Sequence, residues 1–348
     1  MDLIYTNAQN EDLGVLHDYE IDLAYGADEN DFECAVSADT HCCEPGAYLY
    51  FDGTEYGGII DGIQSVSADK KVVYSGRTWH GILGSKVILP LQSGETAPDG
   101  VTVKTTDNDG ASLVERYLVV SGDAHHCLQF IIARCGLSGL FSASSALAGV
   151  NISNHQFNRY TDAYSGLVRM LASVGHKLKV EYTGGGVVLS AAPIYDYSKD
   201  EEFDSDLVTF DVSKCYKTVN HLVCLGKGEL ENRLVVHLYA DESGNISRTQ
   251  TLFGVDERAA VYDYSFAESE EELIAGGEER LKELWAQDSI SVDLDEITDN
   301  YDVGDIVGAV DNVTGLVISA TITKKIVKIN RGITIIDIST DAVTAKRI

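Results

Sequence analysis

Positive charge and long hydrophobic runs are both scarce in this sequence of 348 residues. Lysine and arginine number 26 against 55 aspartate and glutamate, which gives a formal net charge of −29 at pH 7. Because an acidic surface repels phosphate, we expect no stable binding of nucleic acid. No apolar run reaches the roughly 20 residues that a membrane helix needs, and MDLIYTNAQNEDL lacks the basic start of a secretory signal. We therefore expect synthesis in the cytoplasm and no membrane insertion.

Motifs for catalysis, metal binding and nucleotide binding are missing as well. The sequence contains no GxSxG, no HExxH and no strand, GxGxxG and helix in succession. The clusters 41–43 (HCC) and 125–127 (HHC) lack the two-residue gap between ligands that is typical of a zinc site. The segment 105–116 resembles a calcium-binding loop in its middle, but its first and twelfth positions hold Thr105 and Arg116 instead of carboxylates. The seven cysteines are predicted to be reduced thiols. We expect no catalytic residue, no metal, no cofactor and no enzymatic activity.

The pattern of strands and helices predicts several domains of mixed β and α+β class. Short alternating strands run from about 31 to 103, as in a small antiparallel barrel. Asp123 is predicted to cap a helix, a second helix is expected over 155–175 with Tyr160 in its apolar stripe, and a hairpin is expected to turn on 184–186. Ser269 is predicted to cap a third helix.

The last strands resemble the first ones in pattern. YLYFDGTEYGGIIDGI and DIVGAVDNVTGLVISATI both run apolar strand, polar turn, glycine and apolar strand. We therefore predict two small, similar antiparallel β-barrels with α/β insertions. The expected division is 1–111 plus 205–241 for a discontinuous first barrel, 112–204 for an inserted α/β domain, 242–288 for a helical linking region and 289–348 for the second barrel.

Four segments in succession carry a resemblance to a known family. They are AYLYFDGTEYGGIIDGI with VVYSGRTWHGILGSKVI, YKTVNHLVCLGKGELENRLVVHLYADESG, AESEEELIAGGEERLKELW, and YDVGDIVGAVDNVTGLVISATITKKIVKI. In this order they resemble the siphophage tail-tip hub family, the N-terminal hub module of tail-associated proteins, which is similar in fold to the myophage baseplate hub. The resemblance implies a homotrimer in which six barrels form a pseudo-sixfold ring.

The same resemblance implies a function and a set of partners. The ring would adapt the sixfold tail tube to a threefold tip in the virion of a phage or prophage, and an acidic channel wall would let DNA pass. Its neighbours would be the distal tail ring, the tape-measure protein and tip fibre or spike proteins. The residues expected to mark turns and strand junctions of this fold are Gly57, Gly58, Gly226, Gly228, Arg233, Gly304 and Asp305. Many relatives continue into a peptidase, lysin or fibre, whereas this chain ends at Ile348, so we expect no cell-wall cleavage.

Two alternatives stay open at this point. The first is the hub of a contractile injection device that carries a spike. The second is a tail-attached carbohydrate hydrolase or binding module, since acids brought together from distant segments leave no sequence motif.

Overall fold

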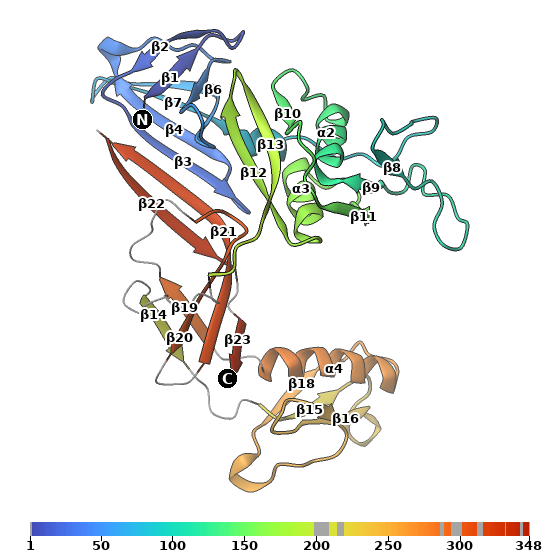
Figure 1. Ribbon diagram of the computed structural model, residues 1–348. Helices are drawn as coiled ribbons and strands as arrows, with labels where there is room; N and C mark the ends of the chain where they lie inside the picture. The colour runs from blue at the N-terminus through green and yellow to red at the C-terminus, as the bar shows by residue number, and fades with distance from the viewer. Residues whose placement is uncertain are drawn as a thin grey trace. The chain divides into compact units, whose positions relative to one another are not determined.

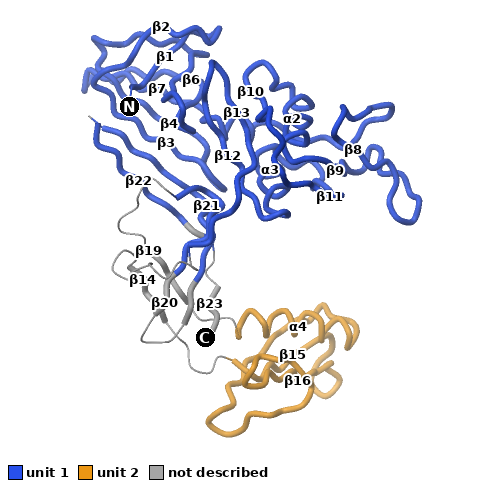
Figure 2. Tube along the Cα trace, viewed as in Figure 1, with its two compact units in different colours: residues 1–208, 294–310, 317–346 blue, residues 209–293, 311–316, 347–348 orange. Residues whose placement is uncertain are grey.

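The chain forms two compact units (Figure 2). The computed structural model describes residues 2–197, 209–213, 219–285, 289–293, 301–311, 316–330, 332–341 and 344–347. Unit 1 comprises residues 1–208, 294–310 and 317–346, and unit 2 comprises residues 209–293, 311–316 and 347–348. Each unit has hydrophobic core clusters of its own, two in unit 1 and one in unit 2.

Unit 1 is built on a sheet of 11 strands (Figure 1), in which the first and the last parts of the chain pair with each other. Its strands are β1 (Leu3–Thr6), β2 (Asp12–Leu16), β3 (Glu20–Gly26), β4 (Asp31–Ser37), β5 (Tyr48–Tyr50), β6 (Gly57–Val66), β7 (Lys71–Thr78), β20 (Ile306–Asp311), β21 (Leu316–Asn330), β22 (Ile333–Thr340) and β23 (Thr344–Arg347). The order is β2-β1-β5-β6-β7-β4-β3-β21-β20, and β22 and β23 also pair with β21.

Alternation of apolar and polar residues gives this sheet one buried face. In β4 every second side chain is buried, among them Phe32 and Cys34. On β21, Val327 lies opposite Leu23 of β3 and is fully buried. The final strands therefore complete the core that the N-terminal strands begin.

The two predicted barrels are replaced by this one sheet. Among the strands that the structure describes, the sheet keeps outer edges and does not close into a barrel. The segment expected to start a second barrel instead pairs through β21 with β3. The alternation in a strand specifies which of its residues face a core, but it does not specify the neighbouring strand. β3 has apolar side chains on its core face and an open edge, and any strand with a matching apolar face can pair there.

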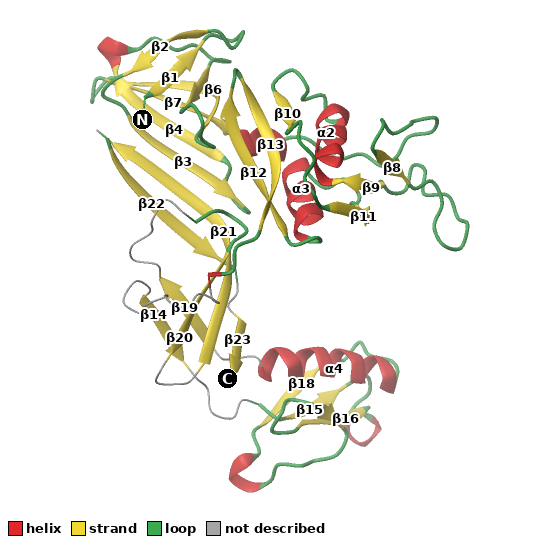
Figure 3. Ribbon diagram, viewed as in Figure 1, coloured by secondary structure: helices red, strands yellow, loops and turns green. Residues whose placement is uncertain are grey.

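The other described residues of unit 1 form three α-helices and two sheets of three strands (Figure 3). Its elements are α1 (Trp79–Gly84), β8 (Val101–Val103), β9 (Val119–Asp123), α2 (Ala124–Arg134), β10 (Phe141–Ala143), β11 (Asn151–Gln156), α3 (Ala163–Ala172), β12 (His176–Thr183) and β13 (Gly186–Pro193). One sheet has the order β10-β13-β12 and the other β11-β9-β8. The helix cap at Asp123 and the hairpin turn at 184–186 are confirmed.

The second predicted helix is shorter than expected. Residues 151–156 form strand β11, and α3 begins only after Asp162, whose carboxylate accepts the N–H of Ser165. Tyr160, expected in the apolar stripe, is 56% exposed and has φ +57°. The cap at Asp162 sets the start of the helix, although the apolar spacing continues upstream of it.

In its described residues, unit 2 combines one α-helix with a sheet of four strands. Its elements are β14 (Thr209–Ser213), β15 (His221–Leu225), β16 (Val235–Ala240), β17 (Ile246–Ser247), β18 (Ala259–Asp263), α4 (Glu270–Trp285) and β19 (Ser289–Asp293). The sheet has the order β17-β16-β15-β18, and β14 pairs with β19. The prediction that the strands within 205–241 extend the first sheet is wrong for β15 and β16, because they pair with β17 and β18. Ser269 caps α4 as predicted, since its hydroxyl accepts the N–H of Glu272.

None of the helices in the described ranges is long and apolar enough to cross a membrane.

Candidate functional site

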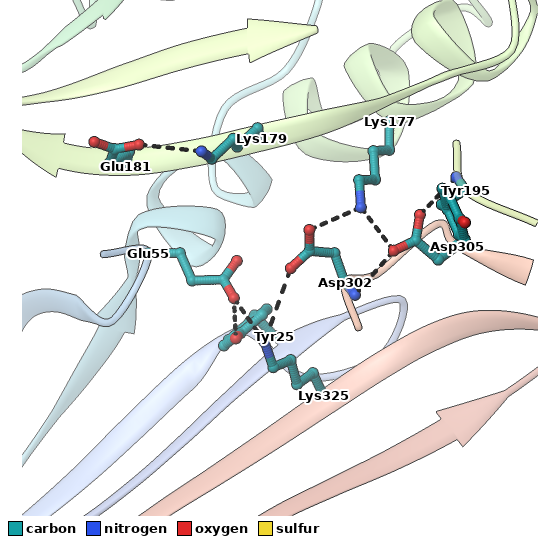
Figure 4. Close-up of polar contacts among 9 residues, drawn as sticks. All are labelled: Tyr25, Glu55, Lys177, Lys179, Glu181, Tyr195, Asp302, Asp305 and Lys325. Atoms are coloured by element: carbon teal, nitrogen blue, oxygen red, sulfur yellow. Dashed lines mark hydrogen bonds and ion pairs between the residues drawn. The ribbon is translucent and has the colours of Figure 1, made fainter. Parts of the chain in front are cut away.

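Two fully buried charged side chains of unit 1, Lys325 and Asp305, belong to one group of contacts (Figure 4). We call this group, which consists of Tyr25, Glu55, Lys177, Asp302, Asp305 and Lys325, the polar cluster. It joins strand β3, the loop before β6, strand β12, the segment before β20, and strand β21. A buried charge is tolerated only where partners replace its lost hydration, so each contact of the cluster bears on the fold.

Lys325 faces inward because of its register in β21. It has the same strand parity as the buried Val327 and Ile329, so the side chain enters the core and is only 2% exposed. Its Nζ lies 3.0 Å from Glu55 Oε1 and 3.9 Å from Asp302 Oδ1. Burial lowers the pKa of Lys325, but Glu55 in particular outweighs this effect, and the pKa of Lys325 is raised. The lysine is therefore charged at neutral pH.

Tyrosine side chains surround this ion pair. Tyr25 donates its hydroxyl to Glu55 Oε1 at 2.5 Å, and Lys325 Nζ lies 5.9 Å from the ring centre of Tyr25 and 5.5 Å from that of Tyr56. Burial, followed by the negative charge of Glu55, raises the pKa of Tyr25 well above its usual value. Tyr25 thus stays protonated and acts as a hydrogen-bond donor.

Asp305 holds the other half of the cluster. Lys177 Nζ lies 2.7 Å from Asp305 Oδ2 and 2.7 Å from Asp302 Oδ2. Asp305 also accepts the backbone N–H of Tyr195 at 2.9 Å and that of Asp302 at 3.1 Å. One carboxylate therefore ties the segment before β20 to β12 and to the chain that follows β13.

A cavity of about 240 Å³ adjoins the polar cluster. The charged residues of its lining are Glu55, Lys179, Glu181, Asp302 and Lys325. Each carboxylate among them contacts a lysine: Glu55 contacts Lys325, Asp302 contacts Lys177 and Lys325, and Glu181 contacts Lys179 at 3.3 Å. These ion pairs connect the segments that line the cavity.

His80, on α1, also lines the cavity and is buried. Its ring stacks on Tyr25 with 4.7 Å between centres and meets the ring of Tyr164 edge-on at 5.4 Å. Within the described residues its Nδ1 has no hydrogen-bond partner. Burial, with the nearby charge of Lys325, lowers the pKa of His80 to about 3, so the ring is neutral at physiological pH.

The residues of unit 1 that are predicted to mark turns and strand junctions lie at close approaches and turns. Gly57 and Gly58 begin β6. A Cβ on Gly58 would lie 2.1 Å from the carbonyl oxygen of Arg77 on β7, so a larger residue would push the two strands apart. Gly304 precedes Asp305 in the turn before β20, and its N–H bonds the carbonyl of Ile322. Of the seven predicted residues, Asp305 is the one that belongs to the polar cluster.

The remaining three, Gly226, Gly228 and Arg233, lie in the connection between β15 and β16. Arg233 donates to the carbonyl of Gly226 at 3.1 Å and to Asp263 Oδ1 at 2.7 Å. Gly228 has φ +113°, and a Cβ there would come within 2.3 Å of the carbonyl oxygen of Asn232. These contacts stabilise the turn; whether they mark the hub family stays a prediction.

Two of the histidines weighed for metal binding, His41 and His125, have other partners. His41 bonds the hydroxyl of Tyr74 at 2.9 Å, and His125 bonds the carbonyl of Ala146 and the N–H of Ala191. Burial raises the pKa of Cys43 to about 12, which keeps that thiol protonated. Across the parts of the chain that the structure describes, no group of three or more His, Cys, Asp or Glu could hold a metal ion.

Sequence reasoning named Asp305 but missed Glu55, Lys177, Asp302 and Lys325. The available signal was the parity of Lys325 with Val327 and Ile329, which places a lysine on the apolar face of a strand. Its partners lie up to 270 residues away in sequence, so no local pattern joins them.

The chain was compared with known families, curated proteins and solved structures. No protein-family model and no curated protein matches the chain. Three solved structures are similar. The prophage tail protein gp18 from Listeria monocytogenes EGD-e is 14% identical over 94% of this chain and 90% of its own, with a TM-score of 0.42. The 43 kDa tail protein of prophage MuSo2 from Shewanella oneidensis is 11% identical over 98% of both chains, with a TM-score of 0.43, and the tail protein from Neisseria meningitidis MC58 is 13% identical over 97% of this chain and 95% of its own, with a TM-score of 0.42. Since these TM-scores are below 0.5, we base no conclusion on them.

Proposed function

We propose that this chain is a structural, non-enzymatic subunit of a phage or prophage tail. More specifically, we propose a hub at the tail tip or baseplate: a homotrimeric ring that adapts the sixfold tail tube to a threefold tip and lets DNA pass. The support begins with the four sequence segments that resemble the hub family in their order. They cover strands of both units and helix α4.

The observation that carries the proposal is the open large sheet. Within the described residues, β2 pairs with β1 alone and β22 with β21 alone, so each has an unpaired backbone edge. Both edges carry exposed aliphatic side chains: Leu13 (56%) and Val15 (38%) on β2, and Ile333 (67%) and Ile335 (56%) on β22. Such edges attract further strands unless a partner covers them.

Two different edges on one sheet suit a ring. If β22 of one subunit lies against β2 of the next, the contact is head-to-tail, and head-to-tail contacts close into rings with rotational symmetry. A twofold dimer would instead need one surface that complements itself. The ring would thus cover both edges of every subunit.

The polar cluster supports a structural rather than an enzymatic role. Each carboxylate on the cavity wall contacts a lysine of the same chain. A general acid or base needs a carboxyl group that is available to a substrate, whereas these carboxylates are engaged in ion pairs within the chain. We therefore propose no turnover on polysaccharides, and Glu55→Gln should have no hydrolytic rate to lower.

The ring can be tested by the mass of the purified chain in solution. Light scattering over a wide concentration range should find a species of three times 37.7 kDa, about 113 kDa. Ile335→Lys places a charge at the β22 edge and should shift this species toward the monomer. Leu147→Lys, at a residue that is 69% exposed and lies outside the large sheet, is the matched control and should leave the trimer intact.

Other outcomes would contradict parts of the proposal. A stable dimer would exclude the threefold ring. A monomer at all concentrations would exclude a ring formed by this chain alone, and antibody labelling of intact tails would then decide whether the chain lies at the tip. A contractile sheath protein encoded beside this chain would favour the contractile alternative. A trimer with a basic channel wall would contradict the proposed passage of DNA along an acidic wall.

A further inference from the structure

Two histidines of unit 2 lie side by side on the sheet face that α4 does not cover. Leu222 and Cys224 of β15 and Val236 of β16 point into the core beneath α4. Since strand side chains alternate, His221 and His237 point to the opposite face. His221 Nε2 lies 2.8 Å from His237 Nδ1, which makes one hydrogen bond between two imidazoles.

His221 is held in place by its surroundings. Its Nδ1 lies 2.6 Å from Glu257 Oε1, and its ring stacks on that of Tyr239 with 4.4 Å between centres. Glu257 is positioned in turn by the buried Asn220, which donates to the carbonyl of Asp256 at 2.7 Å and accepts the N–H of Arg258 at 2.9 Å.

This arrangement assigns the protons of the pair. A carboxylate only accepts hydrogen bonds, so Nδ1 of His221 carries a proton toward Glu257; in the neutral ring, which is the form that binds a metal, Nε2 then carries a lone pair. His237 then donates its Nδ1–H to that lone pair. Histidines that bind metals usually donate their other ring N–H to a carboxylate in the same way, which fixes the tautomer and raises the basicity of the ligand nitrogen.

The two nitrogens are close enough to share one ion once the hydrogen bond between them opens. Their 2.8 Å separation is that of an N–H···N hydrogen bond. Around one ion at 2.0–2.1 Å, two nitrogens lie about 2.9 Å apart at a right angle and about 3.3 Å apart in a tetrahedron, so a small opening of the pair admits a metal. His237 is exposed, so its ring is free to turn its Nδ1 lone pair toward the ion once the proton has moved to Nε2.

We propose that His221 and His237 bind a divalent transition-metal ion of the kind that prefers imidazole, such as Ni²⁺, Cu²⁺ or Zn²⁺. His221 Nε2 and His237 Nδ1 are the two protein ligands, Glu257 orients His221, and water or a side chain of another molecule fills the remaining positions. With two ligands, the site is smaller than the three-residue groups considered above. The proposal does not depend on the tail function.

Calorimetric titration of the full chain with Ni²⁺ tests the site. At pH 7.5 we expect one ion per chain, and His237→Ala should weaken binding at least 10-fold. Glu257→Gln should weaken it to a lesser extent while both ligands remain. His17→Ala, at an exposed histidine elsewhere, and Cys42→Ser, at an exposed thiol, are controls that should leave the affinity unchanged.

A second readout identifies the ligands directly. Electron paramagnetic resonance of the Cu²⁺-loaded chain should show coupling to two nitrogens, and to one in His237→Ala. Because His237 is exposed, this variant should fold, and thermal unfolding without metal checks that it does. Absence of Ni²⁺ binding by the wild-type chain, or equal binding by wild type and His237→Ala, would overturn the proposal.

Discussion

The polar cluster of unit 1 and the histidine pair of unit 2 are both sets of polar side chains on β-strands, but they differ in burial and in completeness. In unit 1, Lys325 and Asp305 are 2% and 0% exposed, and side chains of the same chain meet their charges. In unit 2, His237 is exposed and shares one proton with His221. A buried set completed from within holds the fold together, whereas an exposed pair can open its mutual hydrogen bond and turn both nitrogens toward a ligand.

This comparison predicts large effects on stability in unit 1 and small ones in unit 2. The two tryptophans help to measure it, because Trp79 belongs to unit 1 and Trp285 to unit 2. In a Trp285→Phe background, tryptophan fluorescence reports the unfolding of unit 1 alone.

Lys325→Met should lower the free energy of unfolding of unit 1 by about 3 kcal/mol, because it leaves Glu55 without its cation. Denaturant unfolding followed by Trp79 measures the change. Lys71→Met is the matched control, since its 3.7 Å pair with Glu20 is 52% and 58% exposed, and it should cost about 1 kcal/mol or less. An equal loss in the free energy of unfolding for the two variants would mean that burial does not set the strength of the Lys325 contacts.

Asp305→Asn should lower the free energy of unfolding of unit 1 by about 2 kcal/mol, because it removes a charged acceptor that is bonded to Lys177 and to two backbone N–H groups. The same fluorescence assay applies. Asp107→Asn is the control: this partly exposed carboxylate accepts the N–H groups of Asp109 and Ala111 in its own turn, so about 0.5 kcal/mol or less is expected. An unchanged Asp305→Asn variant would show that Asp302 alone suffices for Lys177.

His80 should make unit 1 sensitive to acid. With a pKa of about 3 in the folded chain and about 6.5 when unfolded, His80 takes up a proton only on unfolding, so stability is lost as pH falls below 6.5. Between pH 7 and pH 5 the loss from this group should be about 2 kcal/mol. His80→Phe should remove that part of the pH dependence, as measured by unfolding at both pH values, whereas His17→Ala should keep it. Identical pH dependence in wild type and His80→Phe would contradict the depressed pKa.

Arg233→Met should change unit 2 least, by about 1 kcal/mol or less, since its partner Asp263 is 59% exposed. Hydrogen exchange of the amides in β15 and β16 measures the change locally. A loss as large as that of Lys325→Met would mean that the turn between these strands supports the whole of unit 2.

Sequence predicted the parts of the fold that depend on neighbours along the chain. Caps at Asp123 and Ser269 and the hairpin turn at 184–186 are confirmed, because a side-chain acceptor or a glycine acts on backbone within a few residues of itself. The start of α3 was placed too early, since an apolar spacing continues upstream of the cap at Asp162.

The partners of distant segments could not be predicted in this way. The alternation in β21 indicated a strand with one buried face, but any open edge with a matching face satisfies that pattern, and the choice of β3 removed the expected second barrel. The polar cluster was missed for the same reason: Lys325 and Glu55 meet only because β21 joins the N-terminal sheet.

By itself, the sequence determined the acidic charge, the alternating strands, the helix caps and the turns, because these depend on composition and on contacts within a few residues. Tertiary structure alone decided that the last strands complete the first sheet, that Lys325 and Asp305 are buried with partners, and that His221 bonds Glu257 through one ring nitrogen and His237 through the other. These features require segments far apart in the chain to meet, and the free energy that selects one pairing over another comes from burying the whole core at once.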